Sequence, residues 1–180
     1  MRKLSLKELN RIDVEGFKQL PKTPVVLILD NVRSALNVGS AFRTADGFAL
    51  EKIFLCGITA QPPHREILKT AIGATDSVDW TYVEKTADLV AQLKEKNYHV
   101  VAVEQAEGST LLPDFVAPTT TPLALVFGNE VKGVSDEVMT MIDECLEVPQ
   151  FGTKHSFNIS VCVGIVCWEV FRQLNYKANL

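Results

Sequence analysis

Near its C-terminus the chain reads Val148-Pro149-Gln150-Phe151-Gly152-Thr153-Lys154-His155-Ser156-Phe157-Asn158-Ile159-Ser160. An apolar segment without a charged residue follows, from Val161 to Trp168. A loop rich in hydrogen-bonding side chains therefore leads directly into a segment that has to be buried. Folds use this arrangement to hold polar groups beside a ligand on a rigid support. The stretch indicates a site without saying which kind.

Two segments further upstream also combine polar side chains with glycine. One reads Leu29-Asp30-Asn31-Val32-Arg33-Ser34-Ala35-Leu36-Asn37-Val38-Gly39-Ser40-Ala41-Phe42-Arg43-Thr44-Ala45-Asp46-Gly47, and the other reads Leu125-Val126-Phe127-Gly128-Asn129-Glu130-Val131-Lys132-Gly133-Val134-Ser135. In order and spacing, the three segments resemble the three motifs of the SpoU (TrmH-like) family of SPOUT RNA methyltransferases. The resemblance covers nearly the whole chain, from Pro24 to about Arg172.

Residues in every motif carry the resemblance. The first motif is matched at Asn37, Gly39, Arg43, Thr44 and Ala45, the second at Phe127, Gly128, Glu130 and Gly133, and the third at Pro149, Gly152, Ser156, Asn158 and Ser160. The third motif departs from the family pattern, since Val148, Gln150 and Phe157 replace Ile, Met and Leu. The departure bears on the shape of the adenine pocket more than on activity.

The resemblance implies a methyltransferase that uses S-adenosylmethionine and acts as a homodimer on a ribose 2′-hydroxyl of RNA. It implies catalytic roles for Arg43, Asn37, Glu130, Ser156 and Asn158, and a cofactor site at Gly128, Val148, Ser156 and Phe157, formed largely by main-chain groups. It also implies a deep C-terminal trefoil knot. Periodicity alone gives no sign of a knot, and threaded connections are rare.

Methylation of a ribose hydroxyl requires a methyl donor held in line, removal or delocalisation of a proton, and an anchor for the neighbouring phosphate. In the family, the residue that matches Arg43 is often assigned as the base. A guanidinium is a poor base because its pKa exceeds about 12. We therefore expect Arg43 to position the ribose and 3′-phosphate and to stabilise the developing alkoxide, with proton removal left open.

Asn37 and Arg43 lie on one predicted helix. If Asn37 caps this helix, Arg43 emerges less than about two turns later, and both side chains can face one pocket. The alternative is that Asn37 is only a cap and Arg43 only a surface charge. Ser156 and Asn158 present the same choice, because either can cap the last helix.

The turn from Gly128 to Glu130 follows a predicted strand, so it lies at the carboxyl edge of the sheet, where open α/β folds bind ligands. Gly128 lets the main chain approach the cofactor closely. We expect Glu130 to orient Arg43 or to bind main-chain amides of the cofactor loop. The segment 128–135 nearly spells a phosphate loop, but Val134 stands where the essential Lys is needed, which excludes ATP or GTP binding.

Short apolar runs alternate with amphipathic helical patterns, which indicates an α/β fold: a mostly parallel sheet with helices on both faces. The runs predict six strands, at 25–29, 53–56, 79–83, 99–103, 123–127 and 146–148. Helical patterns occupy 5–20, 38–45, 64–71, 86–96, a segment beginning at Ser135, and 156–176. We expect 1–23 to be an N-terminal helical extension and 24–180 the methyltransferase domain. The last helix is apolar on all sides through Trp168, so a second subunit is expected to cover part of it.

The composition is that of a soluble domain, with 180 residues, 47% hydrophobic, a net charge of -4 and a pI near 5.4. This charge argues against nonspecific coating of nucleic acid, but it leaves a local basic patch open. The candidates for that patch are Arg2, Lys3, Lys7, Arg11, Arg33, Arg43, Arg65, Lys69, Lys132 and Lys154. For Arg65, Lys69 and Lys132 taken alone, a scattering of solvated charges is an equal alternative. The cysteines lack metal spacing and indicate a reducing cytosol. Because the sequence shows neither a signal peptide nor a membrane-spanning run, we expect a cytoplasmic protein. The spacing of the cysteines predicts that it binds no metal.

Three functions are weighed against one another. RNA 2′-O-methylation is the leading hypothesis, and the pairs Asn37/Arg43 and Ser156/Asn158 argue against base methylation by a relative of the same superfamily. Retention of Arg43 and Glu130 argues against a catalytically silent RNA-binding protein of the same fold. The sequence shows no separate N-terminal RNA-binding domain, which favours transfer RNA over ribosomal RNA as the substrate.

Overall fold

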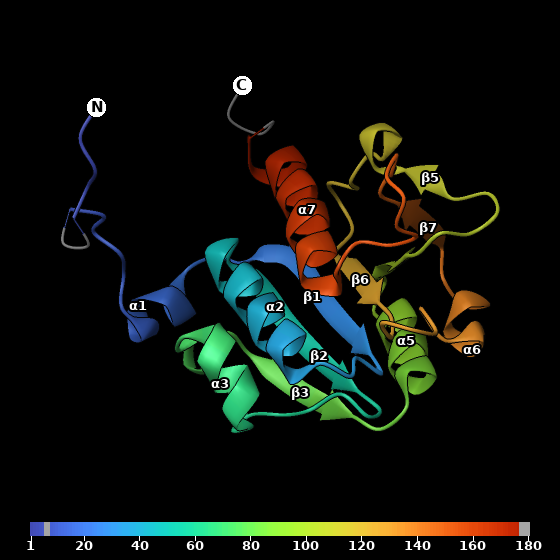
Figure 1. The fold of residues 1–180 in the computed structure, drawn as a ribbon, viewed down its shortest axis with the longest axis horizontal. Coiled ribbons are helices and arrows are strands. Elements are labelled where there is room, and N and C mark those ends of the chain that lie inside the picture. Colours follow the sequence, from blue (N-terminus) through green and yellow to red (C-terminus); the bar gives the residue numbers. More distant parts are fainter. Residues whose placement is uncertain (6–7, 177–180) are drawn as a thin grey trace.

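The computed structural model describes residues 1–5 and 8–176, so Lys7 lies outside the described residues. Within them, one parallel sheet runs through the molecule in the order β3-β2-β1-β6-β4-β7-β5 (Figure 1). Its strands are β1 (Thr23–Asp30), β2 (Leu50–Cys56), β3 (Trp80–Val83), β4 (His99–Val103), β5 (Thr110–Leu111), β6 (Leu123–Phe127) and β7 (Glu144–Glu147). The prediction of six strands is wrong, because the edge strand β5 has two residues and is too short to leave a pattern in the sequence.

The predicted helices at 38–45, 64–71 and 86–96 are confirmed. The described helices are α1 (Val14–Gln19), α2 (Ala35–Gly47), α3 (Arg65–Ala71), α4 (Ala74–Ser77), α5 (Thr86–Glu95), the 3-10 helix Leu112–Asp114, α6 (Asp136–Met139) and α7 (Ile159–Phe171). A π-helical turn, Arg172–Tyr176, continues α7. The last helix begins later than expected, because Asn158 is its N-cap and Ser156 lies outside it.

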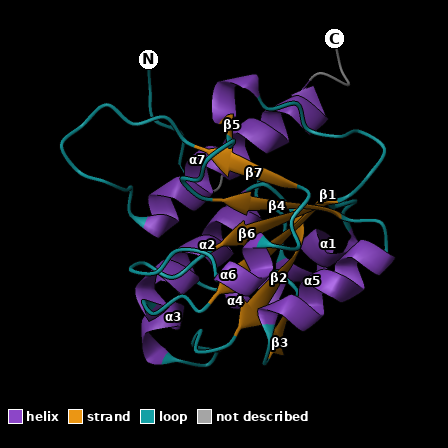
Figure 2. Ribbon diagram, turned by 90° about the vertical axis from the view of Figure 1, so that its right-hand side faces the viewer, coloured by secondary structure: helices purple, strands orange, loops and turns teal. Residues whose placement is uncertain are grey.

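Alternate residues of the central strand face two different cores. Val25, Leu27 and Leu29 of β1 pack in the core that contains α2 and α7, whereas Val26 and Ile28 pack in the core that contains α5 and α6. Side chains of a strand point alternately to opposite faces, so a strand covered on both sides must be apolar throughout. Figure 2 shows the strands from β5 at the top to β3 at the bottom, with helices on either side. The expected burial of both faces is confirmed.

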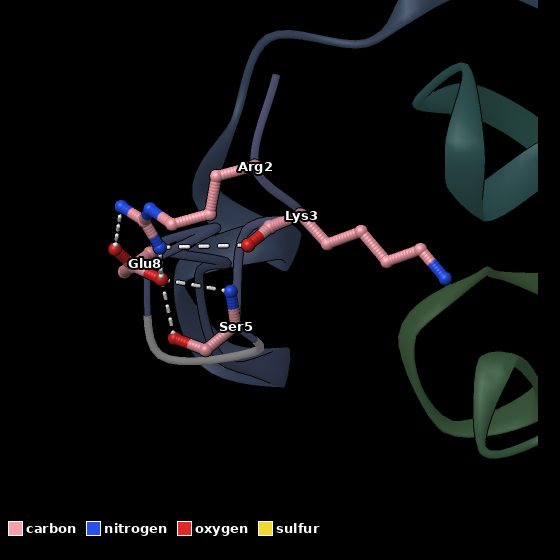
Figure 3. A network of polar contacts seen from close by, with 4 residues as sticks. All are labelled: Arg2, Lys3, Ser5 and Glu8. Atoms are coloured by element: carbon pink, nitrogen blue, oxygen red, sulfur yellow. Dashed lines mark hydrogen bonds and ion pairs between the residues drawn. The ribbon is translucent and has the colours of Figure 1, made fainter.

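The helix predicted at 5–20 is wrong, since only Val14–Gln19 is helical among the described residues there. Asn10 adopts a left-handed φ of 46°, which interrupts a right-handed helix. Upstream of it, the carboxylate of Glu8 accepts hydrogen bonds from the Ser5 amide and hydroxyl and pairs with Arg2 at 2.7 Å (Figure 3). These local contacts replace the continuous amphipathic face that the pattern suggested.

All four cysteines are free thiols. Burial raises the pKa of Cys56 to about 12 and that of Cys162 to about 11, so both stay protonated at neutral pH. No helix in the described part of the chain has the length and apolar character that a membrane span requires. The trefoil knot implied by the resemblance stays a prediction.

Candidate active site

A cavity of about 420 Å³ lies at the carboxyl ends of the neighbouring strands β6, β4 and β7. Parallel α/β sheets bind ligands at this edge. The cavity brings together the four residues predicted for the cofactor site, namely Gly128, Val148, Ser156 and Phe157. Three of the predicted catalytic residues line it as well, namely Ser156, which belongs to both sets, Glu130 and Asn158.

The Glu130 carboxylate ties the second motif to the first. One oxygen accepts a hydrogen bond from the Arg33 amide at 2.8 Å, and the other accepts bonds from the Ser34 amide at 2.9 Å and the Asn37 side chain at 3.2 Å. Burial alone raises the pKa of Glu130, but the bonds from the Arg33 and Ser34 amides outweigh it and lower this pKa overall. Glu130 therefore binds main-chain amides, but those of the first motif and not those of the expected cofactor loop. Among the described residues, no hydrogen bond or ion pair joins it to Arg43.

The third motif joins this network through two asparagines. Asn158 donates a hydrogen bond from Nδ2 to Oδ1 of Asn37 at 3.3 Å. The same Asn158 caps α7, since its Oδ1 accepts bonds from the Ser160 amide at 2.9 Å and the Ser160 hydroxyl at 2.6 Å. Asn37 is not a cap, because the N-cap of α2 is Ser34. Its side chain is thereby free to bridge Glu130 and Asn158.

The loop 128–134 is folded tightly on itself. The Asn129 and Gly133 main chains exchange two hydrogen bonds of 2.9 and 2.8 Å, and the Asn129 side chain binds the amides of Val131 and Lys132. A Cβ added at Gly128 would lie 2.1 Å from the carbonyl carbon of Gly133 and from the Val134 nitrogen. Gly128 is therefore required by the loop itself, in addition to any approach of a ligand.

Arg43 lies apart from this cavity. It is exposed and lines a hollow of about 540 Å³ with Lys69 of α3 and Gly164 of α7, and a further hollow with Arg11. The prediction that Asn37 and Arg43 can face one pocket is wrong within a single chain. Successive residues of an α-helix are about 100° apart, so two side chains separated by six residues point about 120° away from each other. Asn37 and Arg43 therefore leave α2 in different directions.

Sequence reasoning missed two polar residues of the cavity wall, Glu104 and Gln105. The Glu104 carboxylate accepts bonds from the Val134 amide at 3.0 Å and the Gln105 amide at 2.9 Å, and the Gln105 side chain donates to the His155 carbonyl at 2.7 Å. A usable signal was present, because Glu104 is the charge that ends the apolar run of β4 beside β6. Among the described residues, no group of three or more His, Cys, Asp or Glu is arranged to hold a metal ion.

Comparison with known proteins agrees with this geometry. Residues 24–168 match the model of the SpoU rRNA methylase family. The chain is 29% identical over 167 residues to the 23S rRNA (guanosine-2′-O-)-methyltransferase RlmB of Vibrio parahaemolyticus, covering 93% of this chain and 66% of that protein. It is 31% identical over 159 residues to a TrmH family tRNA/rRNA methyltransferase of Staphylococcus saprophyticus, covering 88% of this chain and 63% of that protein.

A solved structure is similar over most of the fold. The AdoMet-bound rRNA methyltransferase of Sinorhizobium meliloti superposes with a TM-score of 0.78 at 26% identity, covering 88% of this chain and 60% of that one. The chain thus spans just under two thirds of the length of the curated relatives above.

Proposed function

The chain belongs to the SpoU family of rRNA methylases, and we propose that it transfers a methyl group from S-adenosylmethionine to a ribose 2′-hydroxyl of RNA. The observation that supports this most directly is the hydrogen-bonded chain Glu130–Asn37–Asn158, which joins all three motifs at one cavity. A family motif that served only folding would have no reason to converge on a ligand-sized space.

The residues of the cavity fit S-adenosylmethionine. The volume of about 420 Å³ lies in the range of small-molecule sites, about 300–1,000 Å³. Its described lining contains the carboxylates of Glu104 and Glu130 and no Lys or Arg, which suits a ligand with a net positive charge. We assign its binding to Gly128, Val148, Ser156 and Phe157. Bound there, the cofactor supplies an electrophilic methyl group.

The remaining chemistry falls to the side chains of this chain. Glu130 is held ionised by its amide partners and fixes the amide group of Asn37. Asn37 in turn orients Asn158 through a hydrogen bond. In this proposal, Asn158 and Ser156 hold the ribose. In this proposal Arg43 binds the 3′-phosphate and stabilises the alkoxide, because a permanently charged guanidinium matches both oxyanions.

We further propose a homodimer whose interface includes α7. Val163, Val166 and Val170 are buried in the core, whereas Val161 and Trp168 of the same helix are 49% and 47% exposed. Figure 1 shows α2 and α7 side by side, and Leu36 of α2 adds a further exposed apolar side chain. Apolar side chains at several positions of two adjacent helices are characteristic of a surface that a partner covers.

The dimer is tested by Val161→Glu, which places a charge on the exposed side of α7. Burying an unpaired carboxylate in an interface costs about 3–5 kcal/mol, so the dissociation constant is expected to rise by two orders of magnitude or more. Sedimentation velocity at micromolar concentration should show a dimer for the wild type and a monomer for this variant. Val116→Glu is the control, since Val116 is 76% exposed and lies outside α2 and α7. A monomeric wild type would refute the interface.

The hollow that holds Arg43 and Lys69 is the proposed contact for the RNA backbone. Ser40, Thr44 and Thr70 add hydroxyl groups to its wall, and such groups together with Lys and Arg bind phosphate oxygens.

Lys69→Ala is expected to weaken RNA binding and to reduce the slope of log affinity against log salt by about one, with unchanged cofactor affinity. Fluorescence anisotropy over a salt series measures this. Lys96→Ala is the control, because Lys96 ends α5 on the opposite face of the sheet. An unchanged salt slope would remove the hollow from the RNA path.

The reaction itself is tested by incubating the protein with S-adenosylmethionine and unmodified RNA, followed by nucleoside mass spectrometry. Ribosomal and transfer RNA are tested in parallel reactions, because one relative is named for 23S rRNA and the other for tRNA/rRNA, and these names do not favour transfer RNA. A 2′-O-methylated nucleoside is the expected product. A methylated base would refute the assignment of the acceptor, and cofactor binding without methylation of either RNA class would favour the silent RNA-binding protein.

A further inference from the structure

We propose that Glu104 makes the cavity prefer S-adenosylmethionine, which has a net positive charge, over its neutral product S-adenosylhomocysteine. The inference rests on the cofactor of the proposed function and concerns a residue outside the three motifs. A carboxylate attracts the donor more strongly than the product, because the product has lost the positive sulfonium charge, and this difference favours cofactor loading and product release. Glu104 is thus a specificity-determining residue in this proposal.

The position of Glu104 places its charge in the cavity wall. It follows the last residue of β4 directly and is partly buried. Its two hydrogen-bond donors, the amides of Val134 and Gln105, are neutral. Within the described residues it forms no ion pair, so its negative charge is not neutralised by a neighbouring Lys or Arg. A carboxylate has about four acceptor positions, and two are occupied here.

The surroundings increase the effect of that charge. The cavity is walled by apolar side chains such as Val103 and Leu146, which keep the local dielectric constant below that of water. Cys162 lies in the same wall, and the nearby Glu104 charge adds to burial in raising the pKa of its thiol. The other carboxylate, Glu130, is already held by two amides and the Asn37 side chain. Glu104 is therefore the carboxylate with more remaining capacity to respond to a bound cation.

If Glu104 acted only by holding the loop 128–134 in place, its loss would change the two ligand affinities in a different way than loss of a charge would. Glu104 also braces the loop 128–134, since a Cβ added at Gly133 would lie 2.2 Å from its carboxylate oxygen. Loss of a brace deforms the cavity for both ligands and lowers both affinities by the same factor. Loss of a charge lowers the affinity for the cationic ligand more. The ratio of the two affinities separates these roles.

The experiment is calorimetric titration of the full chain with S-adenosylmethionine and, separately, with S-adenosylhomocysteine. In Glu104→Gln, which keeps the shape and removes the charge, the affinity ratio of S-adenosylmethionine to S-adenosylhomocysteine is expected to fall by about fivefold or more. Glu104→Asp keeps the charge, so it should lower both affinities and retain most of the ratio. Glu107→Gln removes an exposed charge outside the cavity and should leave both affinities unchanged.

The possible failures are distinguishable. An unchanged ratio in Glu104→Gln, in a protein that binds both ligands, would overturn the role of Glu104 and leave the proposed function standing. A ratio that falls equally in Glu104→Gln and Glu104→Asp would show that keeping the charge does not keep the preference, and it would overturn the charge argument. A wild-type protein that binds neither ligand would overturn the cofactor assignment and this inference with it.

Discussion

The Gly128→Val variant is expected to lose detectable S-adenosylmethionine binding while it retains the fold. Its new Cβ would lie 2.1 Å from the Gly133 carbonyl carbon and the Val134 nitrogen, both main-chain atoms that cannot rotate away. The loop 128–134 must therefore open. Because Gly128, Val131 and Gly133 all line the cavity, its wall is displaced with the loop. Calorimetric titration measures the loss, and circular dichroism checks that the protein is folded.

A second glycine provides the control for this variant. A Cβ at Gly47 meets no atom within 4 Å, and Gly47 lies at the end of α2, outside the cavity. Gly47→Val is therefore expected to bind the cofactor as the wild type does. Unchanged affinity in Gly128→Val would remove the cofactor site from this loop. Equal loss in both variants would indicate general damage and would equally contradict the specific role of Gly128.

The sequence is most informative where one physical requirement dominates. The strands β4 and β6 were predicted with their observed bounds, because strands buried on both faces must be continuous apolar runs. Convergence of the second and third motifs was also predictable, since residues that follow parallel strands meet at one edge of the sheet. Gly128 and Ser156, which both line the cavity, follow from this rule and the family pattern.

Local contacts explain why other parts of the fold were not predicted correctly from the sequence. The pattern of 5–20 suits a helix, but Asn10 in its left-handed conformation and the Arg2–Glu8 pair prevail over it. At the start of α2, Ser34 is a better placed cap than Asn37, and this shift of the helix start changes which side chains share a face. Glu104 was missed because a single acidic residue at the end of a strand is a weak signal without a distinctive spacing, and the fold shows that it lies in the wall of the cavity.

Arg43→Ala is expected to reduce methyl transfer to RNA by about 100-fold or more, with S-adenosylmethionine affinity nearly intact. Loss of one transition-state contact to a developing oxyanion has this scale. Cofactor affinity is spared because Arg43 does not line the cavity of its own chain. Single-turnover methylation and calorimetry measure the two quantities. Arg43→Lys should rescue little, because an ammonium group cannot reproduce the planar fork that holds phosphate and ribose oxygens together.

The position of Arg43 beside Gly164 of α7 leads to a sharper expectation. If the proposed dimer forms through α7, we expect Arg43 of one protomer to act at the cavity of the other.

A heterodimer of two inactive variants tests this expectation. Arg43→Ala and Gly128→Val are each expected to be inactive alone. Their heterodimer contains one complete site, which combines the intact cavity of the Arg43→Ala chain with Arg43 from the Gly128→Val chain. Co-expression with two affinity tags yields this heterodimer, and its activity should approach half that of the wild type. If Arg43 acted on its own cavity, neither site of the heterodimer would be complete and activity would stay at the level of the single variants. Full activity of Arg43→Ala alone would show that the chemistry belongs to another residue.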